Sequence, residues 1–461
     1  MRELCSARGS KSAGARERRG GHGKPLRRKV RALEHLRAVG TSAAGDAVEL
    51  SGGCEDDGEE DDDEDEYKNI DWSGETFVAG DMELENGRVL KRPQVRYRTF
   101  GTLNKTSKNG SVVCHALTGN ASLDDWWGGM LGEGKLFDSS KMFIVCANIL
   151  GSCYGTCGPT SVNPDTGKVY GSTFPDVTIR DSVRLHMQLV REHLGVRRVA
   201  CVIGGSLGGM QTLEWAYLGG ADGFVGAIIP MCCGGYHHPW QIGISESQRL
   251  AIYADPNWQD GKYLDLGRQG PTSGLSVARS IAMITYRSHP GYVRKFGRHE
   301  VAGKEAGHGQ ERFFEVEGYL RHQGNKFCGR FDALSYVKVT RMMDTHDMGR
   351  CRDGGVEASL RSIKQPTLII SVKSDILYPP SEQQFLHEHI PNSRLFEIDS
   401  DHGHDGFLLD QDHIMPEALK FLQEHVYGPL EHADAAAKAA SAQLRGAQGL
   451  RSASTHNKSK L

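Results

Sequence analysis

Long hydrophobic runs are absent from this chain of 461 residues, of which 38% are hydrophobic. No stretch reaches the roughly 20 consecutive apolar residues that a membrane-spanning helix needs, and no apolar region opens the chain as in a secretory signal. We therefore expect neither a membrane span nor secretion. The formal net charge of −3 provides no basic excess, so we expect no nucleic-acid partner for the chain as a whole.

Paired metal-ligand motifs are absent as well. The sequence contains no H-E-x-x-H and no pair of C-x-x-C motifs, so we expect no metal site. The eleven cysteines are an odd number at irregular spacings, which argues against a disulfide framework. Reduced thiols are typical of cytosolic and organellar proteins, and we expect a cytoplasmic location.

Apolar residues are scarce at the two ends of the chain. Residues 1–40 are rich in Arg, Lys, Gly and Ala, whereas Glu55 to Glu66 are acidic at every position except Gly58. Because neither block has the apolar content of a packed core, we expect residues 1–66 to be a disordered, solvated tail. Organellar targeting and RNA binding by the basic block stay open as alternatives. Residues 429–461, rich in Ala, Ser and Lys, are predicted to be a second tail.

Glycine, by contrast, is abundant, and one glycine-rich segment carries the strongest functional signal. Ser206 lies in the G-x-S-x-G pattern of residues 204–208, between the apolar segment 198–203 and apolar positions spaced over 210–218. This order predicts a buried strand, a tight turn and a helix, with the serine at the helix N-terminus. Amide groups and the helix dipole favour a developing negative charge there. A chain with 57 glycines can also match the pattern in a flexible loop, so the partners of the serine have to be found.

Two later segments supply an acid and a histidine in the order that serine nucleophiles of α/β-hydrolases use. Residues 366–372 are predicted to form a buried strand that ends in a polar turn with Asp375, where open α/β sheets place their functional groups. The strand 393–398 leads into a loop that contains His402 and His404. In an extended loop these two side chains point the same way, so spacing leaves the choice between them open.

The whole pattern predicts an α/β-hydrolase fold, with a mostly parallel sheet flanked by helices. The interval from Cys233 to about Cys351 is helical in pattern and too long for an ordinary connection. We therefore expect a helical cap insertion, 233–351, above Ser206, between two parts of the core, 67–232 and 352–428. Parallel strands are predicted at 112–116, 142–148, 199–203, 225–230, 367–372 and 395–398, and an antiparallel edge strand at 94–100.

Several of these segments, taken together, resemble the homoserine O-acetyltransferase family of the α/β-hydrolase superfamily. The resemblance extends from about Tyr67 to Gly428. It implies transfer of acetyl from acetyl-CoA to the hydroxyl of L-homoserine, a step of methionine biosynthesis, with no permanently bound cofactor and a homodimeric state. The segments are 115–120, 204–211, 284–288, 346–350, 375–380 and 403–407.

The resemblance assigns roles to individual residues. Ser206 matches the nucleophile, Asp375 the acid and His404 the base of a catalytic triad. Arg279 matches the residue that binds the substrate carboxylate, and Asp405 the residue that holds the substrate ammonium. An arginine fork and a carboxylate are what a free amino acid requires. Without the resemblance, Arg279 is more simply explained as a structural residue of a helix.

The chemistry adds three further candidates. Tyr286 lies seven residues after Arg279, two helical turns along and on the same face. The tetrahedral oxyanion needs two donors, which we expect to be the backbone N–H of Leu207 and one from the loop near Leu117 or Thr118. The family usually has Met where this chain has Leu207; because the donor is backbone, we expect little effect.

Other functions use parts of the same pattern. A carboxylesterase would use the same triad but needs no pair such as Arg279 and Asp405. A non-catalytic scaffold would not need every triad position filled. Within the family, serine can replace homoserine as acceptor and succinyl-CoA can replace acetyl-CoA as donor. One methylene in a pocket is worth only about 1–3 kcal/mol, so the sequence leaves serine against homoserine open.

Overall fold

The computed structural model describes residues 74–302 and 312–430. All of them belong to 61–461, the second of the two compact units into which the chain divides. The predicted tail 1–66, and all but the first two residues of the predicted tail 429–461, lie outside the described residues.

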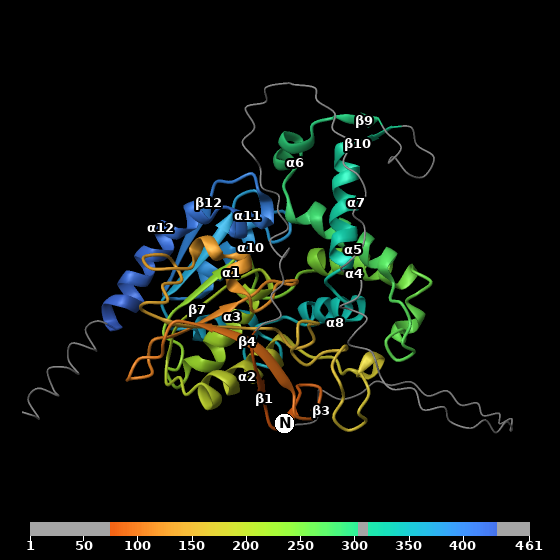
Figure 1. Ribbon diagram of the computed structural model, residues 1–461. Coiled ribbons are helices and arrows are strands. Elements are labelled where there is room, and N and C mark those ends of the chain that lie inside the picture. The colour runs from red at the N-terminus through yellow and green to blue at the C-terminus, as the bar shows by residue number, and fades with distance from the viewer. Residues whose placement is uncertain (1–73, 303–311, 431–461) are drawn as a thin grey trace, which may run out of the picture. The chain divides into compact units, whose positions relative to one another are not determined.

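An eight-stranded sheet forms the centre of the fold, in the order β1-β4-β6-β5-β7-β8-β11-β12 (Figure 1). From β6 to β12 all neighbours pair in parallel, and β4 runs antiparallel to both β1 and β6. The α/β-hydrolase prediction is confirmed. The strands are β1 (Glu75–Val78), β4 (Gln94–Phe100), β5 (Gly110–Cys114), β6 (Phe143–Ala147), β7 (Val199–Gly205), β8 (Ile228–Met231), β11 (Thr367–Val372) and β12 (Ser393–Ile398).

Two details of the predicted strands are wrong. The strand 94–100 is antiparallel as expected, but it is not the edge, because β1 pairs with its outer side. Three of the four β1 residues are exposed, so the strand lacks the alternation of buried and exposed residues that identifies a strand in a sequence. The strand expected from Val225 begins at Ile228, and Val225 forms only an isolated bridge with Val199.

Helices cover both faces of the sheet because each central strand alternates between two apolar cores. Val112 belongs to the first core and Val113 to the second, as the two-residue period of a strand requires. The first core includes α2, α3, α9 and α10, and the second includes α1, α11 and α12. The bounds are α1 (Leu123–Trp126), α2 (Ile179–Gln188), α3 (Leu207–Gly220), α9 (Gly355–Ser362), α10 (Pro380–His389), α11 (Gly406–Leu409) and α12 (Gln411–Leu422).

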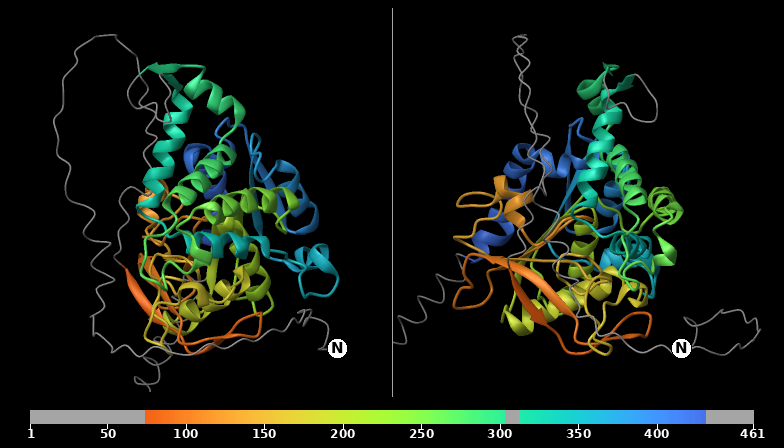
Figure 2. Two further views of the ribbon diagram at one scale, coloured as in Figure 1. Left: turned by 90° about the vertical axis from the view of Figure 1, so that its right-hand side faces the viewer. Right: turned by 45° about the vertical axis from the view of Figure 1, so that its right-hand side comes forward.

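Among the described residues, six helices lie between β8 and β11 in the chain, and four of them pack around a third apolar core. This core joins α4, α5, α7 and α8 through Ile252, Leu275, Phe327 and Tyr336, and Tyr154 from the connection after β6 completes it. Figures 1 and 2 show α7 standing away from the sheet, with β9 and β10 at its far end. The bounds are α4 (Pro239–Ala254), α5 (Thr272–Tyr286), α6 (His289–Phe296), α7 (Glu315–Cys328) and α8 (Ala333–Asp344).

Within this interval the sequence pattern did not indicate the short pair β9 and β10, which is antiparallel. The limits of the cap, 233–351, stay a prediction. Among the described helices, none is both long and apolar enough to cross a membrane. The remaining elements are the strands β2 (Met82–Glu83), β3 (Val89–Leu90), β9 (Glu300–Ala302) and β10 (Arg312–Phe314), with the short helical turns η1 (Gly128–Met130), η2 (Gly171–Thr173), η3 (Leu189–His193), η4 (Gln259–Gly261), η5 (Gly403–Asp405) and η6 (Gln423–Tyr427).

Partly buried ion pairs hold α3 against its neighbours. Glu214 on α3 lies 3.3 Å from Arg180 of α2 and 2.5 Å from Arg352, which follows α8. Glu85 pairs with the same Arg180 at 2.6 Å and with Arg350 at 2.7 Å. Because removing one partner would leave a buried charge uncompensated, this network holds α3 in one position. The helix that follows Ser206 therefore has a fixed axis.

Candidate active site

Ser206 forms the turn between β7 and α3 in a backbone conformation that side chains rarely adopt. Its φ of 57° and ψ of −123° lie in the positive-φ region. Such strain persists only where the surroundings determine it. Here the N–H of Ser206 donates to the carbonyl of Met231 at 2.9 Å, and its carbonyl accepts from the N–H of Met210 at 3.1 Å. The strand-turn-helix arrangement expected from the sequence is present.

The flanking glycines let three backbone segments touch. A Cβ atom on Gly208 would lie 2.0 Å from the carbonyl oxygen of Cys114 at the end of β5. A Cβ on Gly204 would lie 2.5 Å from the carbonyl oxygen of Gly208 and 2.8 Å from that of Cys114. These distances leave no room for any side chain. The start of α3 therefore sits directly against the carboxyl ends of β5 and β7.

Asp375 and His404 meet in the interior, next to the carboxyl end of β11. Asp375 follows β11 by three residues, and His404 lies in η5 after β12. The Nδ1 atom of His404 lies 2.7 Å from Oδ2 of Asp375. The other carboxylate oxygen accepts the N–H groups of Leu377 and Tyr378, both at 2.8 Å. Since a carboxylate only accepts, Nδ1 carries the proton and Nε2 presents its lone pair.

The Nε2 atom of His404 is buried and bonded to no described residue. Burial alone would lower the pKa of His404, but Asp375, and after it Asp405 and Glu382, outweigh burial and raise the pKa above its ordinary value of 6.5. The imidazole is thus shielded from solvent and more basic than an ordinary histidine. His402, the alternative from the sequence, is exposed, and its ring lies 3.9 Å from Asp410 rather than beside Asp375.

A tight turn of residues 116–119 follows β5, and we call it the oxyanion loop. The N–H of Gly119 donates to the carbonyl of Ala116 at 3.0 Å, so Leu117 and Thr118 are the two central residues. Neither of these two donates its N–H to another described residue. Leu207 is the first residue of α3, so its N–H has no acceptor within the helix. The structure therefore leaves both Leu117 and Thr118 as candidates for the second donor.

The predicted acceptor residues come together around the His404 ring. Arg279 is buried on α5, and its guanidinium lies 5.7 Å from the ring of Tyr286 on the same helix, as the seven-residue spacing predicts. The Tyr286 ring lies 6.0 Å from the ring of His404. Asp405 lies 3.1 Å from Arg287. Burial raises the pKa of Asp405, and the Arg287 guanidinium offsets part of this rise.

Three charged residues of this region were not identified from the sequence. Arg287 follows Tyr286 directly, Glu382 lies on α10, and Arg330 connects α7 with α8. Burial raises the pKa of Glu382 to about 7, although Gln241 hydrogen-bonds its carboxylate and works in the opposite direction. Arg287 lies in the segment 284–288 that carries the resemblance, next to the candidate Tyr286, and this neighbour could have indicated it. No residue spacing marks Glu382 or Arg330, because each approaches the site only through the packing of separate elements.

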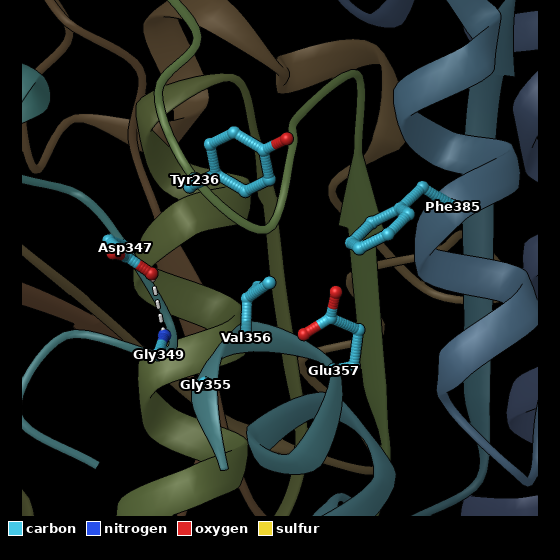
Figure 3. A pocket seen from close by; sticks show the side chains of 7 residues that line it. All are labelled: Tyr236, Asp347, Gly349, Gly355, Val356, Glu357 and Phe385. Carbon is cyan, nitrogen blue, oxygen red and sulfur yellow. Dashed lines mark hydrogen bonds between the residues drawn. The ribbon is translucent and has the colours of Figure 1, made fainter. Parts of the chain in front are cut away.

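A separate hollow of about 290 Å³ lies between the β8–α4 connection, the start of α9 and α10 (Figure 3). Asp347, part of the segment 346–350 on which the family resemblance rests, accepts the N–H of Gly349 at 2.7 Å here. None of the predicted site residues lines this hollow. Its lining consists of Tyr236, Asp347, Gly349, Gly355, Val356, Glu357 and Phe385.

Comparison with known proteins agrees with this geometry. A family model described as alpha/beta hydrolase fold matches residues 112–411. The chain is 48% identical to a homoserine O-acetyltransferase of Salinibacter ruber, over 73% of this chain and 94% of the relative. It is 51% identical to one of Nostoc punctiforme, over 71% and 90% respectively.

Solved structures show the same fold. The homoserine O-acetyltransferase from Bacillus anthracis aligns with a TM-score of 0.69 at 25% identity, over 76% of this chain and 98% of that one. Esterase E22 aligns with a TM-score of 0.67 at 25% identity, over 76% and 99%. By its identity and coverage against the curated relatives, the chain belongs to the homoserine O-acetyltransferase family, on the α/β-hydrolase fold.

Proposed function

We propose that this chain transfers an acetyl group from acetyl-CoA to the hydroxyl of L-homoserine through an acetyl-Ser206 intermediate. The observation that carries the proposal is the buried His404–Asp375 pair with its free Nε2 atom. The sheet order β7-β8-β11 supports a common site, because the strained Ser206 turn follows β7 and Asp375 follows β11. The names of the curated relatives support this choice of substrates. No permanently bound cofactor is required, since acetyl-CoA is a co-substrate.

In the first half-reaction, Ser206 becomes acetylated. His404 Nε2 takes the hydroxyl proton as Oγ attacks the thioester carbonyl, and Asp375 stabilises the imidazolium that forms. The N–H groups of Leu207 and of Leu117 or Thr118 donate to the oxyanion. As the carbon–sulfur bond breaks, the CoA thiolate takes the proton from His404. CoA leaves, and the acetyl ester of Ser206 remains.

In the second half-reaction, the acceptor replaces CoA. His404 takes the proton of the homoserine hydroxyl, whose oxygen attacks the acetyl ester and passes through a second oxyanion at the same donors. Ser206 leaves with the proton from His404. Arg279 binds the acceptor carboxylate, with Tyr286 beside the guanidinium. Asp405 binds the acceptor ammonium, and the same Asp405 carboxylate also pairs with Arg287.

A carboxylesterase is the second candidate, because esterase E22 shares the fold with a similar TM-score. The two functions differ at the acceptor, since an esterase uses water in the second half-reaction. Two residues of opposite charge beside His404 favour an amino-acid acceptor over water. A homodimer and a cytoplasmic location stay predictions.

The first prediction tests the function itself. CoA release by the purified protein is measured with acetyl-CoA or succinyl-CoA as donor, each with homoserine or serine as acceptor. Release should be fastest with acetyl-CoA and L-homoserine. Ser206→Ala should abolish this release, because no other nucleophile starts the reaction. CoA release that is as fast without any acceptor would contradict a transferase and favour the esterase.

The second prediction concerns the intermediate and its base. Incubation with acetyl-CoA alone should add one acetyl group to the peptide that contains Ser206, as mass spectrometry would detect. His404→Ala should prevent this acetylation, whereas His402→Ala, an exposed position, should leave it nearly unchanged. Inactivation by the His402 change instead would show that the base is misassigned.

The third prediction follows from the raised pKa of His404. The base must be neutral, so a raised pKa means that the rate falls as pH decreases through a value above 6.5. Acetylation of Ser206 by p-nitrophenyl acetate, followed as nitrophenolate release between pH 5 and 9, measures this midpoint without any acceptor. An acid limb centred below 6.5 would contradict the predicted direction.

The fourth prediction concerns the acceptor. Arg279→Lys should impair the use of homoserine because an ammonium cannot reproduce the two-pronged contact, and Asp405→Asn should weaken the hold on the acceptor ammonium. Transfer should fall by about ten- to a hundred-fold, the scale of a lost charged hydrogen bond. Ser206 acetylation should persist, and slow hydrolysis should then become visible. Arg268→Lys, at an exposed position, is the matched control. Normal transfer by both site variants would place the acceptor elsewhere.

A further inference from the structure

Arg330 links the helical insertion to the oxyanion loop. It lies between α7 and α8, and its Nη1 atom donates to the carbonyl oxygen of Thr118 at 3.1 Å and to the hydroxyl of Tyr154 at 2.7 Å. The guanidinium also lies 4.9 Å from the ring of Phe327. None of the steps of the proposed reaction uses Arg330.

The segment that carries Arg330 is rigid. The ring of Phe331 stacks on that of Phe327 at 5.2 Å and meets the ring of Tyr154 edge-on at 5.4 Å. Asp332 caps α8 by accepting the N–H of Ser335 at 2.8 Å. The backbone at Arg330 is therefore held by other contacts. Its hydrogen bond to Thr118 restrains the oxyanion loop rather than the arginine.

The other end of the oxyanion loop is held by His115. Its Nε2 atom accepts the N–H of Ile149 at 3.0 Å, so Nδ1 carries the proton and donates to the carbonyl of Ala116 at 2.8 Å. Burial lowers the pKa of His115 to about 4, so this ring is neutral and structural near pH 7. Because the peptide unit is planar and trans, fixing the Ala116 carbonyl directs the N–H of Leu117 the opposite way.

The carbonyl of Thr118, which accepts from Arg330, is the second fixed carbonyl of the oxyanion loop. Fixing its carbonyl orients the Thr118–Gly119 peptide, whose N–H closes the turn on Ala116 at 3.0 Å. We propose that Arg330 is a positioning residue for the oxyanion, which holds the turn 116–119 so that the N–H of Leu117 points at the reacting carbonyl. The contact also couples the helical insertion to the chemistry at Ser206.

A direct role in acceptor binding is the competing explanation. Arg279 lies 5.1 Å from the same Phe327 ring, so two guanidinium groups approach one side of the site. The two explanations affect different half-reactions. An oxyanion forms both in acetylation and in transfer, whereas the acceptor carboxylate is present only in transfer.

The experiment measures the two half-reactions separately in Arg330→Met and Tyr154→Phe. Methionine keeps an apolar side chain against Phe327 but donates no hydrogen bond, and phenylalanine removes only one anchor of Arg330. Acetylation of Ser206 by p-nitrophenyl acetate and by acetyl-CoA should slow about ten- to a hundred-fold in Arg330→Met, up to the scale of a lost oxyanion donor. Tyr154→Phe should slow the same step less. The KM for homoserine should change by less than about threefold in both.

Three results would overturn the inference. Normal acetylation in both variants would show that the contact does not matter. Normal acetylation with a raised homoserine KM would make Arg330 an acceptor-binding residue. Slow acetylation in Arg330→Met together with wild-type acetylation in Tyr154→Phe would show that only the charge of Arg330 acts. Thermal unfolding reports whether Arg330→Met folds, and if it does not, Tyr154→Phe alone tests the contact.

The inference rests on the proposed function, and the wild-type protein separates the two. If the wild type is not acetylated by acetyl-CoA, the proposed function fails. If the wild type is acetylated and transfers to homoserine while both variants match it, only the role of Arg330 fails.

Discussion

The contact between backbone atoms at Gly204, Gly208 and Cys114 is the constraint on which the site depends. With no side chain between them, α3 begins directly against the ends of β5 and β7, and Ser206 is forced into its positive-φ conformation. The same contact brings the loop after β5 beside the start of α3, where the N–H of Leu207 has no acceptor within the helix. The strain at Ser206, the proposed nucleophile, and the position of the proposed oxyanion donors thus share one physical cause.

The electrostatics of the site come from opposite effects of burial on neighbouring groups. Burial opposes charge on His404, Asp405 and Glu382, which lowers the pKa of the histidine and raises the pKa values of the two acids. Asp375 reverses the outcome for His404, first through its negative charge and then through a direct hydrogen bond. Leu377 and Tyr378 hold the other carboxylate oxygen with their N–H groups, so the acid cannot turn away from the histidine.

The interval between β8 and β11 contributes the residues that we propose make the site specific. Arg279 and Tyr286 reach His404 from α5, and Arg330 reaches the oxyanion loop from the α7–α8 connection. A hydrolase sheet therefore carries the groups proposed to make and break bonds, and the helices between β8 and β11 supply the groups proposed to select the acceptor. This division explains why an esterase and an acetyltransferase can both align with the same chain.

The sequence by itself determined the α/β fold, the Ser206 turn and the place of Asp375 after a strand, because these follow from local periodicity and from glycine at fixed spacings. It also placed Arg279 and Tyr286 on one helix face. Spacing left His402 and His404 open, the family resemblance chose His404, and the tertiary structure brings His404 to Asp375. Only the tertiary structure added β1 outside β4 and brought Arg287, Glu382 and Arg330 to the site. Those contacts join residues far apart in the chain, and their partners are decided by how the elements pack, which no local pattern records.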